Sequence, residues 1–154
     1  MIEELVNLLI EKEYSITTAE SCTGGMIASS IVDIANASKV FNQAFVTYAN
    51  EAKIKYLKVN EDTIKEHGVV SEEVCFQMAK GAQREANANV ALVTSGIAGP
   101  TGGTPTKPVG MVCFGIAIND NIYTYTKYFG NVGRNKVRTL AKDFIIAETV
   151  RLLK

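Results

Sequence analysis

The segment that most constrains this chain is Thr18-Ala19-Glu20-Ser21-Cys22-Thr23-Gly24-Gly25. A short β-like stretch at 14–17 precedes it, and a helix-like stretch at 26–32 follows it. The pattern predicts a strand, a tight turn and a helix in direct succession, with a hydroxyl near the helix N-terminus. Backbone N–H groups at that end have no partner within the helix and favour negative charge. A nucleophile, an oxyanion or a phosphate would suit this place.

Helical and strand patterns alternate along the rest of the chain. Helices are expected at 2–13, at 24–34, from 50, from 60 to 67, from 71 and from about 134, with Asn50, Asn60 and Ser71 as caps. Strands are expected at 15–19, at 90–95, at 109–118, at 122–129 and, with a mostly buried face, at 41–48. This order predicts a single domain over 1–154, an α/β fold forming a three-layer α/β/α sandwich around a mixed β-sheet.

Composition narrows the classes of partner. Sixteen basic residues balance sixteen acidic ones, so no global field draws the chain to nucleic acid or anionic lipid. No apolar run approaches the roughly 20 residues of a membrane span, and the acidic start Met1-Ile2-Glu3-Glu4-Leu5 does not resemble a signal peptide. The three cysteines are scattered and form no CxxC pair, which argues against a disulfide framework or a zinc site. We therefore expect a cytoplasmic protein without direct nucleic-acid or membrane contact.

Ser21 and Cys22 are both possible nucleophiles, and residue type alone does not choose between them. A hydroxyl needs a nearby base, but the only histidine, His67, sits at a predicted helix end where its charge complements the helix dipole. A Ser-His-Asp triad is therefore disfavoured. Lys53 is the best remaining base, because it lies in the first turn of a predicted helix, where positive charge is disfavoured and the pKa is lowered. The alternative for Lys53 is an ordinary solvated surface lysine.

Two further segments suit a ligand. The glycine-rich loop, residues 96–108, carries four glycines in eight residues and would let the backbone approach a ligand, or would simply connect two strands. Arg134 begins the last predicted helix, with Arg138 one turn later; a guanidinium there suits phosphate, unless it only faces solvent. Tyr48 would orient a ligand ring or fill the core.

Together these residues resemble the C-terminal domain family of the competence/damage-inducible protein CinA, which includes nicotinamide mononucleotide (NMN) deamidases of the PncC type. The resemblance rests on motifs in unbroken order over nearly the whole chain. They are the run 18–25, Val46-Thr47-Tyr48, Asn50-Glu51-Ala52-Lys53, His67-Gly68-Val69-Val70-Ser71-Glu72, Ser95-Gly96-Ile97-Ala98-Gly99-Pro100, Gly102-Gly103, Lys107-Pro108-Val109-Gly110 and the Arg134/Arg138 segment.

The resemblance implies hydrolysis of NMN to nicotinate mononucleotide and ammonia, without metal or cofactor. It implies that Ser21 is the nucleophile, Lys53 the base and Arg134 the phosphate ligand. The residues expected to shape the substrate pocket are Thr23, Gly24, Gly25, Tyr48, Gly96 and Gly99. Backbone N–H groups from Thr23 to Gly25 would stabilise the oxyanion, and Cys22 would pack beneath the site. One departure is Val132-Gly133-Arg134, where family members often carry Gly-Asp-Arg.

Other functions remain open from the sequence. The domain could be a non-catalytic nucleotide-binding or regulatory module, because family membership does not guarantee turnover. A DNA-associated competence factor is disfavoured by the zero net charge and the lack of basic-aromatic clusters. Apolar residues on the helices lead us to expect a homodimer or a higher homo-oligomer.

Overall fold

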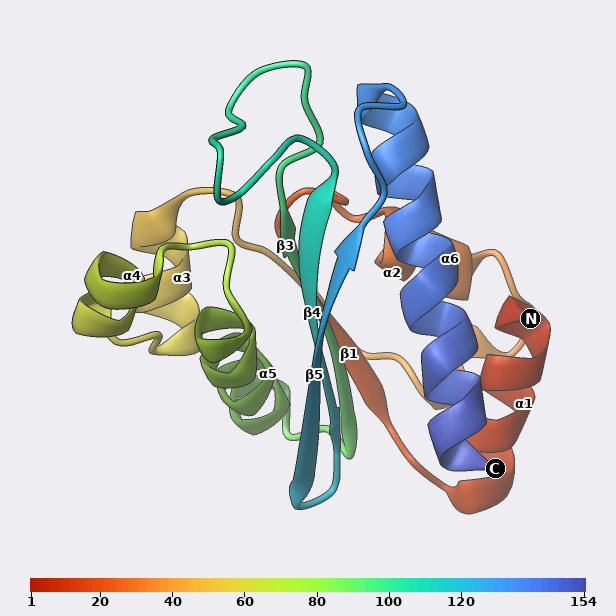
Figure 1. The fold of residues 1–154 in the computed structure, drawn as a ribbon. Helices are drawn as coiled ribbons and strands as arrows, with labels where there is room; N and C mark the ends of the chain where they lie inside the picture. The colour runs from red at the N-terminus through yellow and green to blue at the C-terminus, as the bar shows by residue number, and fades with distance from the viewer.

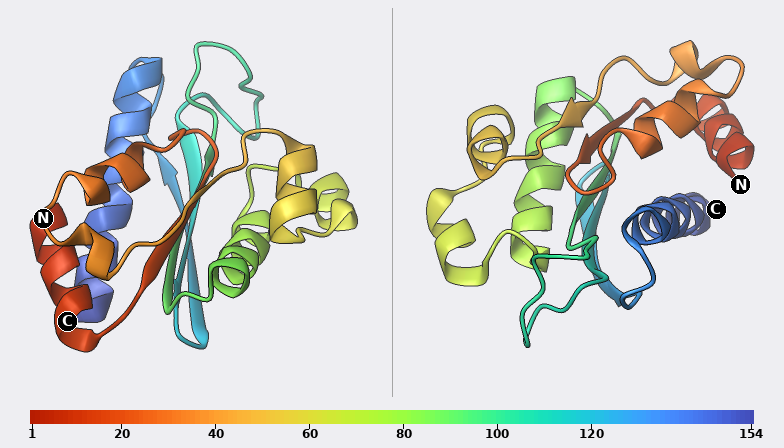
Figure 2. Two further views of the ribbon diagram at one scale, coloured as in Figure 1. Left: turned by 180° about the vertical axis from the view of Figure 1, so that it is seen from behind. Right: turned by 90° about the horizontal axis from the view of Figure 1, so that it is seen from above.

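A five-stranded sheet separates two layers of helices in the computed structural model, which describes residues 1–154 (Figure 1). The strands are β1 (Ile16–Glu20), β2 (Phe45–Val46), β3 (Val90–Gly96), β4 (Met111–Ile118) and β5 (Asn121–Tyr128). The helices are α1 (Ile2–Lys12), α2 (Met26–Val32), the short 3-10 helix η1 (Ala37–Lys39), α3 (Asn50–Leu57), α4 (Glu61–His67), α5 (Glu72–Ala86) and α6 (Arg134–Leu153). Figure 2 shows α1, α2 and α6 on one face of the sheet and α3, α4 and α5 on the other.

The sheet is mixed and has the strand order β2-β1-β3-β4-β5. β1 pairs in parallel with both β2 and β3, so Ala19 lies beside Phe45 on one side and beside Val93 on the other. β4 and β5 form an antiparallel hairpin that adds to β3. The α/β/α sandwich around a mixed sheet that the sequence predicts is therefore confirmed.

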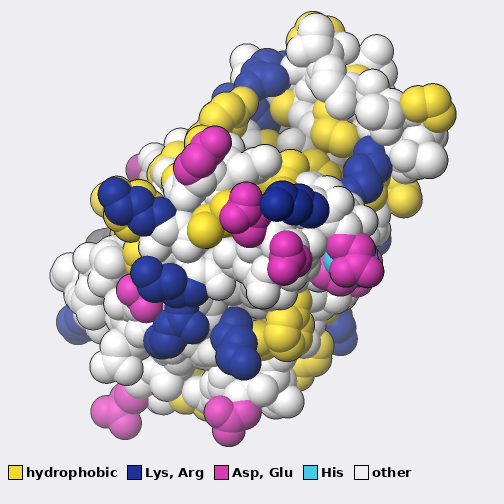
Figure 3. Space-filling model, turned by 90° about the vertical axis from the view of Figure 1, so that its left-hand side faces the viewer, with side chains coloured by type: hydrophobic (Ala, Val, Ile, Leu, Met, Phe, Trp, Pro, Cys, Tyr) yellow, Lys and Arg dark blue, Asp and Glu magenta, His cyan; other side chains and the backbone are white.

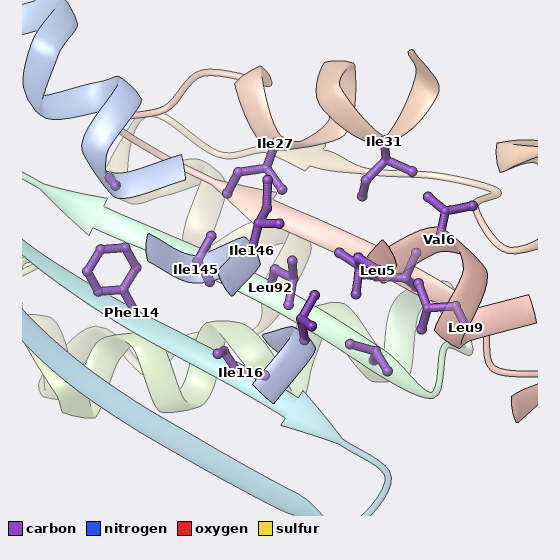
Figure 4. Close-up of a cluster of buried hydrophobic side chains, with 14 of the residues drawn as sticks. Leu5, Val6, Leu9, Ile27, Ile31, Leu92, Phe114, Ile116, Ile145 and Ile146 are labelled. Atoms are coloured by element: carbon purple, nitrogen blue, oxygen red, sulfur yellow. The ribbon is translucent and has the colours of Figure 1, made fainter. Parts of the chain in front are cut away.

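Each face of the sheet is closed by its own apolar core. In Figure 4, Leu5 and Leu9 of α1 and Ile27 of α2 gather over the sheet with Phe114 of β4 and Ile145 of α6. The core on the opposite face joins α5 to the sheet and is made of smaller side chains, among them several alanines. Burying apolar side chains of this kind supplies the main favourable free energy of folding.

Glycine allows two unusually close approaches in the α3–α5 layer. A Cβ at Gly115 of β4 would lie 2.8 Å from the Cys75 carbonyl oxygen of α5. A Cβ at Gly81 of α5 would lie 1.9 Å from the Leu57 carbonyl oxygen of α3. Since no real Cβ tolerates such a distance, these two glycines set how closely α5 packs on the sheet and α3 packs on α5.

The outer surface of the α3–α5 layer carries a mixture of acidic and basic side chains. Figure 3 shows acidic and basic side chains interspersed on the face formed by α3 and α4. None of the six α-helices has the combination of length and apolar composition that a membrane-crossing helix requires.

The expected strand at 41–48 is largely wrong. Only Phe45–Val46 pairs as a strand, and Phe41 adds a single bridge to Ile16. β2 lies at the edge of the sheet, where one side has no partner, and the Val46 side chain is 54% exposed. The apolar pattern therefore reflected an exposed edge rather than a buried face.

The helix boundaries also differ in places. The helix expected at 24–34 covers only Met26–Val32, because Gly24 and Gly25 adopt positive φ values of 59° and 101° and form a turn. Asn50 is not a cap, since Ala49 takes that position and Asn50 is already helical. Asn60 and Ser71 do cap α4 and α5, accepting hydrogen bonds from backbone N–H groups two and three residues ahead.

The topology brings several loops together at one end of the sheet. The chain leaves β1 through α2 on one face to reach β2, then returns through α3, α4 and α5 on the other face to β3. A crevice opens at such a reversal, at the carboxyl ends of parallel strands, and ligands commonly bind there. The β3–β4 connection and the start of α6 lie at the same end (Figure 1).

Candidate active site

A cavity of 310 Å³ lies at the carboxyl ends of β1 and β3, a volume within the usual range of small-molecule sites. Its walls come from the turn after β1, the start of α3, the segment before α5, the glycine-rich loop and the start of α6. The lining residues that matter most below are Ser21, Cys22, Tyr48, Lys53, Gly96, Gly99 and Arg134. Six of the nine residues expected to form the site therefore line one cavity, together with Cys22, although they are far apart in the sequence.

The Lys53 amine and the Ser21 hydroxyl form a hydrogen bond inside this site, with 3.1 Å between Nζ and Oγ. The amine also donates to the carbonyl oxygens of Thr47, at 2.7 Å, and Tyr48, at 3.1 Å. A neutral amine has two N–H groups and one lone pair. If the two carbonyls take the two N–H groups, the lone pair is left facing Ser21, where it can accept the hydroxyl proton.

Lys53 is buried, with 1% of its surface exposed, so it is not the solvated lysine that the sequence left as an alternative. Burial lowers the pKa of the Lys53 amine below its ordinary value, because a charged ammonium loses its hydration inside the protein. The predicted direction of the shift is therefore confirmed, but burial is its main cause. No acidic side chain forms a salt bridge with the amine to oppose this effect.

Cys22 lies beside Ser21 but is poorly suited to attack. Burial raises the pKa of the Cys22 thiol to about 11, so the thiolate is scarce at neutral pH. No hydrogen bond joins its sulfur to Lys53, whereas the Ser21 hydroxyl has one. Of the two nucleophiles that the sequence left open, the geometry favours Ser21.

Glu20 is a part of the site that sequence reasoning missed. Its side chain is fully buried, and its two carboxylate oxygens accept hydrogen bonds from the backbone N–H groups of Ile27, at 2.9 Å, and Ala28, at 3.0 Å. The hydroxyls of Thr18 and Thr23 donate to the same carboxylate. The Glu20 carboxylate thus binds the N-terminus of α2, in the place where an external anion could otherwise bind. The available signal was an acidic residue inside an otherwise apolar and threonine-rich strand.

The turn from Ser21 to Gly25 joins β1 to α2 and is called the nucleophile turn below. The Thr23 side chain does not face the cavity: its fully buried hydroxyl donates to Glu20, at 2.6 Å, and bonds Thr94, at 2.8 Å. Gly24 and Gly25 do not line the cavity either. Of this turn, only Ser21 and Cys22 line the cavity.

Gly96 and Gly99 of the glycine-rich loop line the cavity as expected, and Gly102 of the same loop lines it too. A Cβ at Gly96 would lie 2.7 Å from the Val112 side chain, and a Cβ at Gly99 would lie 2.4 Å from Val109. Gly99 also has a positive φ of 82°. The loop is therefore tightly packed at these points, which supports a shaped wall rather than a slack connection.

Arg134 connects two parts of the cavity wall. Its guanidinium donates to the Gly99 carbonyl oxygen and to the Tyr48 hydroxyl, both at 2.9 Å. Tyr48 is 61% exposed, so it is not the core filler that the sequence left as an alternative. The preceding Gly133 adopts φ 109°, which a residue with a side chain rarely takes.

The single histidine is apart from this chemistry. His67 ends α4 as predicted, with its ring near the carboxylates of Glu66 and Glu73, and it does not line the cavity. The Lys107 amine caps the same helix end by donating to the carbonyl oxygens of His67 and Val70. No group of three or more His, Cys, Asp or Glu side chains is arranged to hold a metal ion.

Comparison with known proteins identifies relatives of this fold and site. Residues 1–153 match the family described as the CinA C-terminal domain. A CinA-like protein of Kosmotoga olearia is 46% identical over 144 residues, which are 94% of this chain and 35% of that protein. The chain spans about a third of the length of the curated relatives it matches.

Solved structures agree with the sequence match. A CinA superfamily protein from Escherichia coli has a TM-score of 0.95 and 35% identity, covering 98% of this chain and 87% of that one. A competence/damage inducible protein from Agrobacterium tumefaciens has a TM-score of 0.92 and 37% identity, covering 99% of this chain and 96% of that one. The chain therefore belongs to the CinA C-terminal domain family.

Proposed function

We propose that this domain is an amidohydrolase that converts NMN to nicotinate mononucleotide and ammonia, with Ser21 as nucleophile and Lys53 as general base. The observation that carries the proposal is the 3.1 Å hydrogen bond between a buried lysine amine and a serine hydroxyl in the wall of a ligand-sized cavity. A serine becomes nucleophilic at neutral pH only with such a base beside it.

The first half of the reaction acylates the enzyme. Neutral Lys53 takes the Ser21 proton while Oγ forms a bond to the carboxamide carbon of NMN, and the C=O electron pair moves to oxygen. The tetrahedral intermediate then collapses: the C–N bond breaks, and protonated Lys53 gives its proton to the leaving nitrogen. Ammonia departs and Ser21 carries the nicotinoyl ester.

The second half restores the enzyme. Lys53, neutral again, takes a proton from water as the water oxygen attacks the ester carbon. The bond between that carbon and Oγ breaks, and the proton returns from Lys53 to Ser21. The two hydrogen bonds that Lys53 donates to the carbonyl oxygens of Thr47 and Tyr48 keep its lone pair directed at the reacting oxygen in both halves.

The remainder of the cavity suits the rest of NMN. Val70, Ile97 and Ala98 provide an apolar wall against which a pyridine ring would pack. Arg134, with donors on a planar guanidinium, would bind the phosphate at the other side of the same cavity. Its present hydrogen bonds to Gly99 and Tyr48 hold the guanidinium at the rim of the cavity.

The decisive experiment is an assay of ammonia and nicotinate mononucleotide from purified protein and NMN. Ser21→Ala and Lys53→Met are expected to lower kcat by at least about 1,000-fold. Ser29→Ala, an exposed hydroxyl of α2 without a side-chain hydrogen bond, is the matched control and should leave kcat unchanged. Tight NMN binding without ammonia release would instead indicate a non-catalytic nucleotide-binding module.

A second assay tests the phosphate end. Arg134→Ala should raise KM for NMN by about 10- to 100-fold, the loss expected for a charge-assisted contact. It should leave the weak turnover of nicotinamide riboside, which lacks the phosphate, unchanged. An equal loss of activity with both substrates would show that Arg134 does not bind the phosphate.

A further inference from the structure

Arg138 of α6 donates hydrogen bonds to the backbone of the nucleophile turn, although it does not line the cavity. Its Nε donates to the Cys22 carbonyl oxygen at 3.0 Å, and its Nη2 donates to the Thr23 carbonyl oxygen at 3.2 Å. Its remaining nitrogen, Nη1, donates to the Asn135 side chain at 3.0 Å. All three guanidinium nitrogens are thus engaged, and two of them fix consecutive carbonyl groups directly after Ser21.

These hydrogen bonds also fix two N–H groups of the turn, those of Thr23 and Gly24, because each shares a peptide unit with a carbonyl that Arg138 holds. In a trans peptide bond the N–H points opposite to the C=O of the same peptide unit. Since the Cys22 carbonyl points to Arg138, the Thr23 N–H points away from Arg138. Neither the Cys22 nor the Thr23 N–H donates to another residue, whereas the Gly24 N–H donates to the Ser21 carbonyl oxygen. Of these residues Cys22 lines the cavity, and Thr23 is fully buried.

The opposite side of the turn is held as well. The buried carboxylate of Glu20 binds the Thr23 hydroxyl and the start of α2. Gly24 adopts a φ of 59°, and a Cβ there would be in van der Waals contact with Nη2 of Arg138, at 3.4 Å. The turn is therefore clamped between a carboxylate and a guanidinium, and its two free N–H groups directly follow the nucleophile.

We propose that the Cys22 N–H, directly after the nucleophile, is an oxyanion-hole donor, and that Arg138 is the positioning residue that holds this turn in place through the Cys22 and Thr23 carbonyl oxygens. This inference rests on the proposed function. When Oγ of Ser21 bonds the carboxamide carbon and the proton passes to Lys53, the C=O electron pair moves to oxygen, and the Cys22 N–H donates to the resulting oxyanion. The guanidinium also places a positive charge beside the turn at which the oxyanion forms.

The kinetic test compares Arg138→Ala with Lys136→Ala, an exposed cation of the same helix without hydrogen-bond partners. Arg138→Ala should lower kcat by about 100-fold with KM nearly unchanged, as for removal of one oxyanion donor. Arg138→Lys should lose about 10-fold, because an ammonium keeps the charge but lacks the planar fork. Added guanidinium ion should restore part of the Arg138→Ala turnover. A raised KM with normal kcat would overturn the proposal, because it would make Arg138 a substrate ligand.

A second readout does not depend on NMN. Phenylboronic acid forms a tetrahedral adduct with a nucleophilic serine, and boron-11 NMR measures its affinity. The wild type and Lys136→Ala should bind it equally, and both Arg138 variants should bind it more weakly. Equal adduct affinity in Arg138→Lys and the wild type would overturn the inference, even if Arg138→Ala failed to fold. If the wild type forms the adduct but releases no ammonia from NMN, the proposed substrate is wrong, and adduct affinity alone decides the role of Arg138.

Discussion

The carboxylate of Glu20 accepts the backbone N–H of Ile27 at 2.9 Å, so the N-terminus of α2 is already occupied by an anion. The sequence correctly indicated that negative charge is favoured at this junction. The protein supplies that charge itself, from the residue immediately before Ser21. Under the proposed function the substrate phosphate would therefore bind elsewhere, and Arg134, which also lines the cavity, would be its ligand.

Glu20→Gln should destabilise the protein by about 2 kcal/mol, since the glutamine NH₂ would face the Ala28 N–H and leave that donor unsatisfied. Glu3→Gln removes the same charge from the exposed first turn of α1 and should change stability by less than about 0.5 kcal/mol. Urea unfolding of both variants measures the difference. Equal midpoints for the two variants would show that the buried carboxylate does not hold the turn.

The rate of hydrolysis should rise with pH as Lys53 loses its proton, because only the neutral amine can act as base. Burial lowers the pKa of Lys53, so the midpoint of the rise should lie below about 10.4, the ordinary lysine value. Measuring kcat/KM from about pH 6.5 upward avoids the phosphate titration near 6. A midpoint at the ordinary lysine value would argue against Lys53 as the base.

The same lowered pKa predicts how stability depends on pH. Between the folded-state pKa of Lys53 and about 10.4, the unfolded chain binds a proton that the folded protein does not. The free energy of unfolding contributed by this residue therefore rises with pH across that window. Lys53→Met should lack the rise, so wild-type stability should gain on that of the variant between neutral and alkaline pH. If the difference in unfolding free energy between the wild type and Lys53→Met were the same at every pH, burial would not lower the pKa of Lys53.

The positions of the site residues could be predicted from sequence more readily than their surroundings. Ser21 follows β1 and Arg134 begins α6, and both were placed by local signals that survive in the structure. The burial of Lys53 could not be predicted, because it depends on contacts with the turn after β1 and with the carbonyls before α3. Glu20 was missed since β1 is buried on both faces, which removes the alternation that separates inward from outward residues.

Cys22→Ala should retain kcat within about 2-fold, because the thiol forms no hydrogen bond with Lys53, whereas the Ser21 hydroxyl does. The raised pKa of its thiol, about 11, also predicts that iodoacetamide inactivates the native enzyme slowly at neutral pH. Assays of ammonia release beside Ser21→Ala make the comparison direct. If Cys22→Ala were as inactive as Ser21→Ala, the choice of nucleophile would be reversed.

Gly81→Ala should disturb the site from the far side of α3. The added Cβ would lie 1.9 Å from the Leu57 carbonyl oxygen, and Leu57 is one turn beyond Lys53 on the same helix. Alanine favours a helix by about 1 kcal/mol over glycine, but overpacking against backbone costs about 1–3 kcal/mol. We therefore expect no gain in melting temperature and a reduced kcat, because α3 must move and carries the base with it. Lys80→Ala, at an exposed position of α5, should change neither the melting temperature nor kcat. A Gly81→Ala protein with a higher melting temperature and full activity would show that α3 does not depend on this contact.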